Sequence, residues 1–323
     1  MELELITRPI QSWLDEFEQL YAETMQVSGI NFQPMLDFVS AQKGKRIRPQ
    51  VLLLAAQLCG NPNRNSLEYA LILELLHTAT LIHDDVVDDT KKRRGQPSVM
   101  AKFGNRSAVL LGDYILSIAI NHGVATKNFK ILEILASLAQ YLSEGELAQL
   151  KSSSEILIDE VCYFEIIQKK TAILLSSCAE MGAISVNADV EKTEILQRIG
   201  KYLGICFQLR DDIFDYYKQG ELGKPTGNDI KEGKVTLPLI YALRTAPKEE
   251  SKAILSMIQE RRFSSENIQK IMHFAKVYQG IEYAKAKMQE FKIEVVKLLK
   301  YFPDTEAKQA VLLLTDYIIG RTK

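Results

Sequence analysis

The amino-acid sequence predicts an all-α fold, and three observations support this. No proline occurs between Pro97 and Pro225. Because proline costs about 3 kcal/mol inside a helix, its absence permits long helices in this region. Apolar residues there recur at the helical period, and they include Ile156, Val161, Phe164, Ile167 and Leu174. No extended run alternates polar and apolar residues in the manner of a β-strand.

The predicted helices follow one another along the chain and are separated by short loops. Their expected ranges are 10–27, 33–42, 47–59, 65–88, 106–124, 129–150, 155–186, 190–217, 236–245, 248–260, 264–300 and 304–319. Pro49 falls early in the third helix, where proline is tolerated. A break near Gly280 is expected in the range 264–300. Loops are expected at 61–63, 90–97 and 220–233. Because no flexible linker or shift in composition divides the chain, a single domain over residues 1–323 is expected.

Composition and charge are those of a globular protein with a large core. The chain has 323 residues, of which 46% are hydrophobic, and this is enough to bury such a core. It has 40 basic and 41 acidic residues and a net charge of −1. The bulk charge therefore gives no reason to expect nucleic-acid binding.

The four cysteines are expected to be reduced thiols. Cys59, Cys162, Cys178 and Cys206 form no C-x-x-C pair and have no metal-finger spacing. Each lies in an apolar, helix-like run. A disulfide framework is therefore not expected.

Neither a targeting segment nor a membrane-spanning segment is expected. Glu2 and Glu4 interrupt the start of the chain, which does not resemble a signal peptide. The most apolar stretch, residues 108–120, is short for a bilayer span and carries Asp113. The sequence therefore predicts a cytoplasmic protein without a transmembrane segment.

The stretch HTATLIHDDVVDDTKKRRG, residues 77–95, ends an apolar helix with a cluster of acids. Asp84 and Asp88 are four residues apart, so they share a helix face and repel one another unless a cation lies between them. Because no cysteine or histidine lies at ligand spacing, these carboxylates favour a hard ion, above all Mg²⁺. In proteins Mg²⁺ commonly bridges carboxylates to substrate phosphates.

A second acidic motif, LRDDIFDYY, repeats this spacing. Asp211, Asp212 and Asp215 form another D-D-x-x-D sequence at the end of a long apolar helix. One such motif could be a solvated helix end, but two copies make that interpretation unfavourable. Two acidic helix ends facing one cavity would hold several metal ions, and those ions would hold a polyanion.

Cationic residues gather at several places in the chain. GKRIRP, residues 44–49, puts Lys45, Arg46 and Arg48 at a helix start, where backbone N–H groups also favour phosphate. The other clustered cations are Arg93, Arg94, Lys169, Lys170, Lys224 and Lys234. Each alone is more often a solvated charge than a ligand, but together they exceed the need of one phosphate group. We therefore expect two diphosphate substrates, one bound through metal ions and one held directly by Lys and Arg.

Four segments resemble the signature blocks of the trans-isoprenyl diphosphate synthases: HDDVVDDTKKRRG, GKRIRP, QKKTA and FQLRDDIFDYYKQGELGKPTGNDIKEGK. The blocks run in that family's order over about residues 40–245. The resemblance implies the all-α isoprenoid synthase fold, with helices surrounding a central catalytic cavity, and usually a homodimer. It also implies that an allylic diphosphate ionises with the help of Mg²⁺. The double bond of isopentenyl diphosphate then attacks the carbocation, and a proton is lost.

The resemblance also implies roles for individual residues. Mg²⁺ would be bound by Asp84, Asp88 and Asp211, supported by Asp85, Asp212 and Asp215. The allylic diphosphate would be held by Arg93, Lys170, Lys224 and Lys234. Isopentenyl diphosphate would be held by Lys45, Arg48, His77 and Arg94. Thr171 and Gln208 would lie near the developing cation. These roles agree with the physics, because preorganised positive charge stabilises a leaving diphosphate and an apolar cavity keeps water from a carbocation.

Two histidines near the first acidic motif differ in the helix face that they occupy. His77 lies seven residues before Asp84, two turns along the same stripe, so a diphosphate contact is favoured over a structural role. His83 turns away from that stripe and is expected to be structural.

Residues one or two turns before Asp84 are expected to set the length of the product. Thr80 lies one turn before Asp84 with Ala79 beside it, and both are small. The helical wheel favours Thr80 as the floor of the product tunnel. The weight on Ala79 comes from the resemblance, in which bulky aromatic residues here give short products. Without them the tunnel extends at least one further turn, about 5.4 Å, and Leu76 is a further candidate for its floor.

Two further features resemble long-chain members of the family. The first acidic motif has only two residues between its aspartate pairs, without the insertion of typical bacterial farnesyl synthases. The sequence GELAQ, residues 145–149, is also closer to the long-chain enzymes. The sequence therefore predicts a long-chain polyprenyl diphosphate synthase that uses a primer such as farnesyl or geranylgeranyl diphosphate. Peripheral contact with a membrane could assist product release.

Other functions were weighed against this one. A farnesyl or geranylgeranyl synthase is the main alternative within the family, and a non-catalytic subunit of a heteromeric synthase is another. The latter should have lost acids or arginines of the motifs, and none is missing. A class I terpene cyclase handles one diphosphate and would not need GKRIRP together with a second D-D-x-x-D motif. A purely structural helical protein would leave both acidic motifs unexplained.

Overall fold

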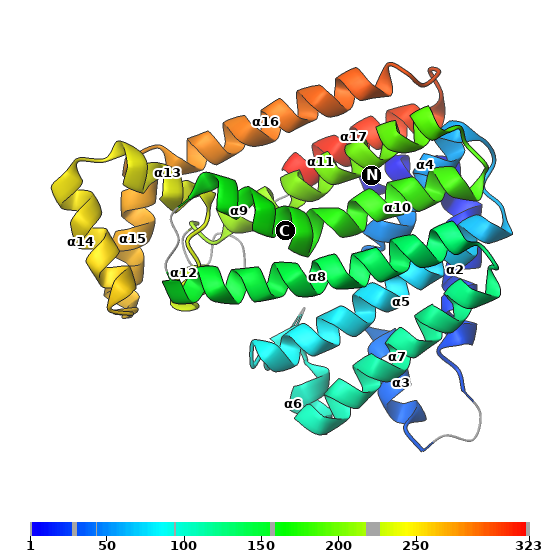
Figure 1. The fold of residues 1–323 in the computed structure, drawn as a ribbon, viewed down its shortest axis with the longest axis horizontal. Helices are drawn as coiled ribbons and strands as arrows, with labels where there is room; N and C mark the ends of the chain where they lie inside the picture. Colours follow the sequence, from blue (N-terminus) through cyan, green and yellow to red (C-terminus); the bar gives the residue numbers. More distant parts are fainter. Residues whose placement is uncertain are drawn as a thin grey trace. The chain divides into compact units, whose positions relative to one another are not determined.

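A computed structural model describes residues 2–27, 31–42, 44–93, 95–155, 159–217 and 227–320. In these ranges nearly all the secondary structure is helical, which confirms the predicted all-α class (Figure 1). The strands in the described part are β1 (Lys92–Arg93) and β2 (Gln96–Pro97), which pair antiparallel in a short hairpin. This hairpin occupies the loop that the sequence predicts at 90–97.

The chain groups into two compact units. Unit 1 comprises residues 1–137, 177–197 and 302–311, and unit 2 comprises 138–176, 198–301 and 312–323. Four of the boundaries between the units fall inside helices, and the one at 301/302 falls in the turn between the last two described helices. The expected single domain over residues 1–323 stays a prediction.

Before residue 126, the described part of the chain forms one 3₁₀ turn and seven α-helices. These are α1 (Glu2–Thr7), η1 (Arg8–Ile10), α2 (Gln11–Thr24), α3 (Gln33–Ala41), α4 (Ile47–Cys59), α5 (Arg64–Val87), α6 (Val99–Phe103) and α7 (Asn105–Ala125). The sequence predicts five of them to within a few residues and misses α1 and α6, which are short.

The remaining helices follow in chain order. They are α8 (Phe129–Glu155), α9 (Glu160–Ile167), η2 (Gln168–Ala172), α10 (Ile173–Ser185), α11 (Val190–Phe214), α12 (Asn228–Lys231), α13 (Leu237–Thr245), α14 (Lys248–Gln259), α15 (Ser265–Val277), α16 (Gly280–Leu299) and α17 (Glu306–Gly320). The element η2 is a π-helical turn between α9 and α10.

Helix α5 is the apolar centre of unit 1, and it carries the first acidic motif at its end. It packs against α7, α4 and α2. Its start is fixed by a capping box, in which the Asn63 side chain accepts a hydrogen bond from the Ser66 backbone and the Ser66 hydroxyl accepts one from the Asn63 N–H. Near the C-terminal end of α5, helix α7 packs closely against it. A Cβ atom at Gly112 of α7 would lie 2.3 Å from Nε2 of His83 in α5, so glycine permits this close packing.

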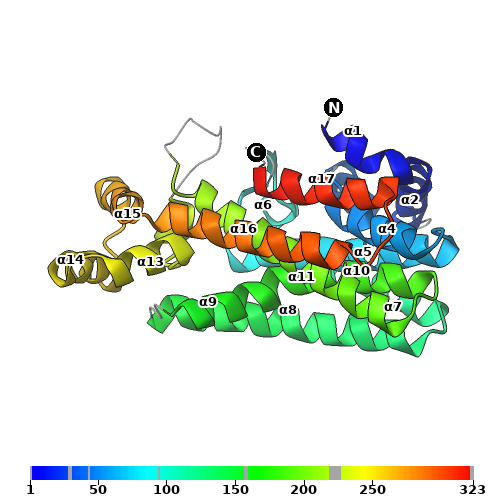
Figure 2. The same ribbon diagram turned by 90° about the horizontal axis from the view of Figure 1, so that it is seen from above.

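In unit 2, helix α13 contacts α14, α15 and α16 (Figures 1 and 2). The predicted break near Gly280 is confirmed, since α15 ends at Val277 and α16 begins at Gly280. A Cβ atom at Gly280 would lie 1.9 Å from the carbonyl oxygen of Pro238, so glycine permits the close approach to α13.

The prediction of one helix over 155–186 is wrong. Helix α8 continues to Glu155, and a new helix starts at Glu160. The carboxylate of Asp159 caps that start by accepting from the N–H groups of Val161 and Cys162. Val161 is therefore in a first turn, where it is 65% exposed instead of lying on a buried stripe. Ile156, from the same expected stripe, lies outside the described residues.

One described helix bears on the expectation that no stretch of the chain could span a bilayer. Helix α7 has 21 residues and is apolar enough to cross a membrane by length and composition alone. It continues beyond the apolar stretch 108–120 at both ends, and one third of its most apolar window is buried within the structure. This is weak support for a membrane span, because the core helix of a soluble protein meets the same criteria.

All four cysteines are free thiols, as the sequence predicts. Burial raises the pKa of Cys206 to about 12 and that of Cys59 to about 11. Both groups therefore stay protonated at neutral pH, which makes them poor nucleophiles and poor metal ligands.

The core of unit 2 offers a test of packing. Ile271 in α15 is fully buried, and Ile271→Ala should cost about 2–5 kcal/mol in unfolding free energy, because it removes buried methyl groups and leaves a cavity. Differential scanning calorimetry should show a lowered thermal midpoint. Ile293→Ala in α16 is the matched control, because Ile293 is 54% exposed and its truncation should change the midpoint little. Equal midpoints for the two variants would contradict the described packing of α15.

Candidate active site

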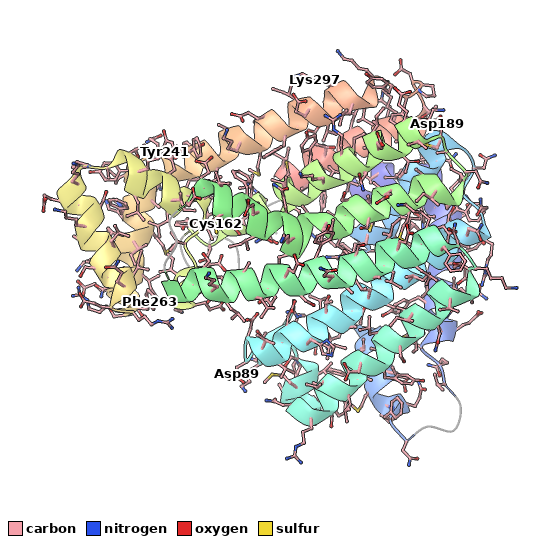
Figure 3. All side chains as sticks on the ribbon, in the orientation of Figure 1. Asp89, Cys162, Asp189, Tyr241, Phe263 and Lys297 are labelled. Atoms are coloured by element: carbon pink, nitrogen blue, oxygen red, sulfur yellow. The ribbon has the colours of Figure 1, made fainter. Side chains whose placement is uncertain are left out.

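The first acidic motif lies where α5 ends. The helix stops at Val87, and Asp88 caps it with its N–H donating to the Asp84 carbonyl at 2.8 Å. Asp89 adopts a left-handed conformation with φ 49°, which turns the chain toward the hairpin (Figure 3). Asp84 is half-buried and Asp88 is exposed, so this helix end presents two carboxylates one turn apart.

Asp85 has a different environment from its neighbours. It is 3% exposed, and its Oδ1 accepts hydrogen bonds from Nε and Nη2 of Arg93 at 2.9 and 2.8 Å. Arg93 lies on β1, so this ion pair fixes the hairpin against the end of α5. The structure therefore brings together two predicted site residues, with Asp85 orienting Arg93. Arg94, the next predicted ligand, lies outside the described residues.

The segment before α4 is held by Arg46, whose role the sequence does not indicate. Its guanidinium pairs with Glu18 at 2.7 Å and with Glu74 at 2.8 Å, and it lies 4.3 Å from the ring centroid of Tyr21. Arg46 also has a left-handed backbone with φ 50°, which is uncommon for a residue with a side chain. These contacts stabilise that conformation and make Arg46 a structural residue.

Lys45 and Arg48 flank this anchor. Lys45 is exposed, and its carbonyl oxygen accepts a hydrogen bond from the Gln50 side chain at 2.7 Å. Arg48 is half-buried in the first turn of α4. The backbone that carries both predicted phosphate ligands is thus fixed from both sides by Arg46 and Gln50.

The other predicted residues of unit 1 lie along α5. His77 is half-buried, and its carbonyl accepts from the Thr80 hydroxyl at 2.9 Å. Thr80 is half-buried, whereas Ala79 and Leu76 are each 1% exposed. His83 faces α7, with Nε2 3.2 Å from the carbonyl of Val109, which supports its expected structural role.

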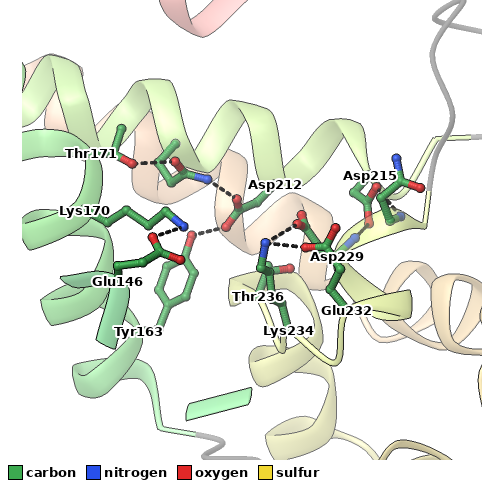
Figure 4. Close-up of polar contacts among 12 residues, drawn as sticks. Glu146, Tyr163, Lys170, Thr171, Asp212, Asp215, Asp229, Glu232, Lys234 and Thr236 are labelled. Atoms are coloured by element: carbon green, nitrogen blue, oxygen red, sulfur yellow. Dashed lines mark hydrogen bonds and ion pairs between the residues drawn. The ribbon is translucent and has the colours of Figure 1, made fainter. Parts of the chain in front are cut away.

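Unit 2 contains a cavity of about 130 Å³ that gathers five of the predicted site residues. These are Lys170, Thr171, Gln208, Asp212 and Lys234. Its wall also includes Ile166 and Ile167. Tyr163, Asp229 and Thr236, which Figure 4 shows, line it as well. Cations, hydrogen-bonding groups and apolar side chains therefore meet around one space, as a site for a diphosphate with a hydrocarbon tail requires.

A chain of hydrogen bonds runs along one wall of this cavity (Figure 4). The Thr171 hydroxyl donates to Oε1 of Gln208 at 2.8 Å, and Nε2 of Gln208 donates to Oδ1 of Asp212 at 2.7 Å. The hydroxyl of buried Tyr163 donates to the other carboxylate oxygen of Asp212. Because Asp212 can only accept when ionised, the network fixes which end of the Gln208 amide faces Thr171.

Asp212 itself is too enclosed to bind a metal ion directly. It is 2% exposed, and burial raises its pKa to about 6 although the hydrogen bonds from Tyr163 and Gln208 act in the opposite direction. Burial likewise raises the pKa of Tyr163 well above its ordinary value. Asp211, the preceding residue on α11, is half-buried.

Asp215 has a structural role that the motif does not suggest. Its carboxylate accepts from the backbone N–H groups of Asn228 and Asp229 at 2.9 and 3.0 Å, and its carbonyl accepts from Gly227. It therefore fixes the start of α12. Burial is the main cause that raises the pKa of Asp215.

Two lysines at the cavity are paired with acids. Nζ of Lys170 lies 2.6 Å from Oε2 of Glu146 on α8. Lys234 lies 2.5 Å from Glu232 and 3.9 Å from Asp229. Lys224, predicted to act with them, lies outside the described residues.

Sequence reasoning missed Tyr163 and Asp229. Tyr163 lies in an apolar run, YFEII, so nothing local distinguishes it from a core residue. Asp229 lies in GNDIKEGK, within a block already quoted for its lysines, and the acid beside those lysines was an available signal. Burial first, then the carboxylates of Asp212 and Asp215, raise the pKa of Asp229 well above its ordinary value.

The residues present fit a hard divalent cation without forming a complete site for one. In the described ranges, no group of three or more His, Cys, Asp or Glu side chains is placed to hold a metal ion. Each acidic motif offers carboxylate oxygens, the donors that Mg²⁺ prefers. A cation held by one or two carboxylates would need further oxygens from a substrate diphosphate.

Comparisons with known proteins agree with these observations. A family model described as Polyprenyl synthetase matches residues 31–275. Octaprenyl diphosphate synthase of Escherichia coli (strain K12) is 32% identical over 307 residues, which cover 95% of this chain and 93% of that protein.

Solved structures show the same similarity in three dimensions. A polyprenyl synthase from Caulobacter crescentus CB15, complexed with calcium and isoprenyl diphosphate, has a TM-score of 0.92 and 32% identity, covering 99% of this chain and 98% of that one. A geranylgeranyl pyrophosphate synthase from Bacteroides thetaiotaomicron has a TM-score of 0.85 and 36% identity, with 99% of both chains covered. These similarities confirm the isoprenoid synthase fold that the sequence predicts.

The carboxylates of unit 2 predict how stability depends on pH. Because the pKa of Asp229 is raised in the folded protein, its contribution favours folding below the ordinary value of 3.8 and is lost as pH rises through the folded pKa. Asp229→Asn should therefore raise the thermal midpoint at pH 7 in EDTA, and the difference should close near pH 4.

Asp304→Asn is the control for this prediction. Lys308 holds the pKa of Asp304 below its ordinary value, so this substitution should lower the midpoint slightly or leave it unchanged. An unchanged midpoint for Asp229→Asn at pH 7 would show that the folded protein carries the Asp229 charge without cost.

Proposed function

The chain belongs to the polyprenyl synthetase family, and on that premise we propose that it is a long-chain polyprenyl diphosphate synthase. It condenses isopentenyl diphosphate onto an allylic diphosphate such as farnesyl or geranylgeranyl diphosphate. One observation carries this proposal: the unit 2 cavity combines Lys170 and Lys234 with the Thr171–Gln208 pair and an apolar wall. The cations suit a diphosphate, and the apolar wall suits the hydrocarbon attached to it.

The allylic diphosphate binds to Lys170 and Lys234, with Lys224 and Arg93 as further ligands. Lys170 and Lys234 each have an acid partner, which keeps the ammonium group at the cavity before substrate arrives. Their positive charge then stabilises the negative charge that grows on the leaving diphosphate as its bond to the hydrocarbon breaks.

The carbocation forms beside polar groups that cannot attack it readily. The Thr171 hydroxyl donates to Gln208, and the Gln208 amide is held by Asp212, so their oxygen atoms are oriented before reaction. The apolar residues Ile166 and Ile167 exclude water from the same cavity. Isopentenyl diphosphate, held by Lys45, Arg48, His77 and Arg94, supplies the attacking double bond. The proton lost from the condensed product goes to the released diphosphate.

Mg²⁺ is the proposed metal, and Asp84, Asp88 and Asp211 are its proposed ligands. When bound, it neutralises charge on the allylic diphosphate and so makes that group a better leaving group. The three ligands are more accessible than Asp85 and Asp212, which are buried and engaged by Arg93 and Tyr163. This division between accessible and engaged acids supports the assignment.

The product is proposed to be long because α5 carries small residues before Asp84. Ala79 and Thr80 are small at positions where an aromatic side chain would close the proposed tunnel, and Leu76 is the next large side chain along this face. The E. coli relative is named as an octaprenyl enzyme, which favours the same conclusion. The similarity to a geranylgeranyl pyrophosphate synthase keeps a short-chain product as the alternative.

We propose a cytoplasmic homodimer whose product leaves through peripheral contact with a membrane. An exposed apolar surface supports the dimer: it comprises Val109, Leu110, Ile120 and Val124 of α7 and Phe129 at the start of α8. Surfaces of this kind commonly mark protein–protein contacts. Sedimentation velocity of the purified chain tests this, since a monomer would contradict it.

The proposed activity is tested by incubating the purified chain with Mg²⁺, labelled isopentenyl diphosphate and several allylic primers. The dephosphorylated products are then sized by chromatography. Products longer than geranylgeraniol support the long-chain function, and shorter ones support the alternative. No consumption of isopentenyl diphosphate by the chain alone would favour a partner subunit, and release of a cyclic hydrocarbon would favour a cyclase.

Substitution of metal ligands should remove most turnover and leave the fold intact. Asp84→Ala or Asp211→Ala should lower kcat by at least about 100-fold, because the leaving diphosphate loses part of its charge stabilisation. Steady-state kinetics and circular dichroism measure the two effects. Asp304→Ala is the control, because this side chain is 87% exposed and outside the proposed site. Wild-type rates for both motif variants would reject the metal assignment.

A bulky residue at the proposed tunnel floor should shorten the product. Ala79→Phe or Thr80→Phe should shift the product ladder by one or more isoprene units, because each side chain fills about one helical turn. Reversed-phase chromatography of the dephosphorylated products gives the ladder. A control at the exposed Ile293, Ile293→Phe, should leave it unchanged. If both α5 variants keep the wild-type ladder, the hydrocarbon follows another path.

A further inference from the structure

We propose that Gly145 and Gly204 are positioning residues for the reaction, because they hold the π-helical turn η2 in the place where it presents Lys170 and Thr171 to the cavity. The inference rests on the proposed function, and it concerns residues that touch no substrate in that proposal. It follows from three features of unit 2: the shape of η2, the space beside it, and the hydrogen bonds made by the two helices that cover it.

The turn η2 is a widened segment inside an otherwise α-helical run. It covers Gln168–Ala172, and the N–H of Ile173 donates to the carbonyl of Gln168, five residues earlier. Such turns are rare, and they recur at functional sites. The cavity is lined by Ile166 and Ile167 before the turn and by Lys170 and Thr171 within it. The widened turn therefore contributes two polar side chains to the cavity wall.

Helix α8 can approach η2 only because it has no side chain at Gly145. A Cβ atom there would lie 2.7 Å from the backbone nitrogen of Lys170 and 3.0 Å from the carbonyl carbon of Lys169. These are backbone atoms of a hydrogen-bonded turn, so they cannot rotate away as a flexible side chain could. Any residue other than glycine must push α8 and η2 apart.

Helix α11 approaches the same turn from its other end. A Cβ atom at Gly204 would lie 2.4 Å from Cα and 2.9 Å from Cβ of Ala172. Ala172 is fully buried in this contact. The turn thus touches two glycines from two different helices.

Each glycine is close in sequence to the residue that holds one of the two functional side chains. Glu146 follows Gly145 directly, and its carboxylate is the partner of Lys170 at 2.6 Å. Gln208 lies one turn after Gly204 on the same face, and it accepts the hydrogen bond of Thr171 at 2.8 Å. The distance of each helix from η2 therefore also sets the geometry of Lys170 and Thr171. Separation by even a fraction of an ångström would weaken both contacts.

The first test compares glycine substitutions of similar steric severity. Gly145→Ala and Gly204→Ala should lower kcat/KM for the allylic diphosphate by about 10- to 100-fold, since small displacements of binding groups are costly. The KM for isopentenyl diphosphate should stay within about twofold. Gly182→Ala is the matched control, because its Cβ would lie 2.3 Å from the carbonyl oxygen of Leu52, and its nearest neighbours, Leu52 and Ala55, belong to unit 1 and not to η2. This control should lower the thermal midpoint but should not selectively lower kcat/KM for the allylic diphosphate.

A second test loosens the contact instead of crowding it, so it does not depend on whether the crowded variants fold. Ala172→Gly removes the methyl group that faces Gly204, and it should lower kcat by about 10-fold through a looser Thr171–Gln208 pair. Ala183→Gly is the control, since Ala183 is an equally buried alanine of α10. Both variants should lose similar stability, about 1 kcal/mol.

The outcomes separate this inference from the proposed function. A wild-type chain that consumes neither diphosphate overturns the proposed function. The inference is overturned if the wild-type chain is active but Gly145→Ala and Ala172→Gly have the same kinetics as their controls, Gly182→Ala and Ala183→Gly. That outcome leaves the proposed function standing. A loss that raises the KM for both substrates equally also overturns it, because a general structural role would have that effect.

Discussion

The constraint on which the unit 2 site depends is the crowding of three carboxylates that are largely shielded from solvent. Asp212 and Asp215 are buried, Asp229 is half-buried beside them, and the pKa of each is raised. Asp212 is held by two hydrogen-bond donors, and Asp215 by backbone N–H groups. Holding these carboxylates close together lowers the stability of the folded protein when no ligand is bound. Functional sites commonly reduce stability in this way.

Much of the fold could be predicted from the sequence because its signals are local. The helical period and the proline gap predict long helices, and α4 begins and ends at the predicted residues. The break at Gly280 follows from glycine chemistry, and the structure adds its reason, the close approach to Pro238. The failures are also local: the cap at Asp159 divides a predicted helix, and the π-helical turn has no recognised sequence signal.

The candidate site could be predicted only in part. The acidic and basic motifs identified Lys170, Asp212 and Lys234, and the family resemblance added Thr171 and Gln208; all five line one cavity. Partners distant in the sequence could not be predicted, because spacing says nothing about contacts between separate helices. Tyr163 reaches Asp212 across 49 positions, and Arg46 pairs with acids 28 positions away on either side. For the same reason, the division of each D-D-x-x-D motif into accessible and engaged acids appears only in three dimensions.

The anchoring of Arg46 has a consequence for transplanting the GKRIRP segment. Its left-handed residue is stabilised by Glu18 of α2, Glu74 of α5 and the ring of Tyr21. The hexapeptide grafted alone onto another scaffold would lack all three, and its backbone would relax toward ordinary helical or extended angles. A designer who wishes to move this segment with its backbone conformation must therefore move α2 and α5 with it.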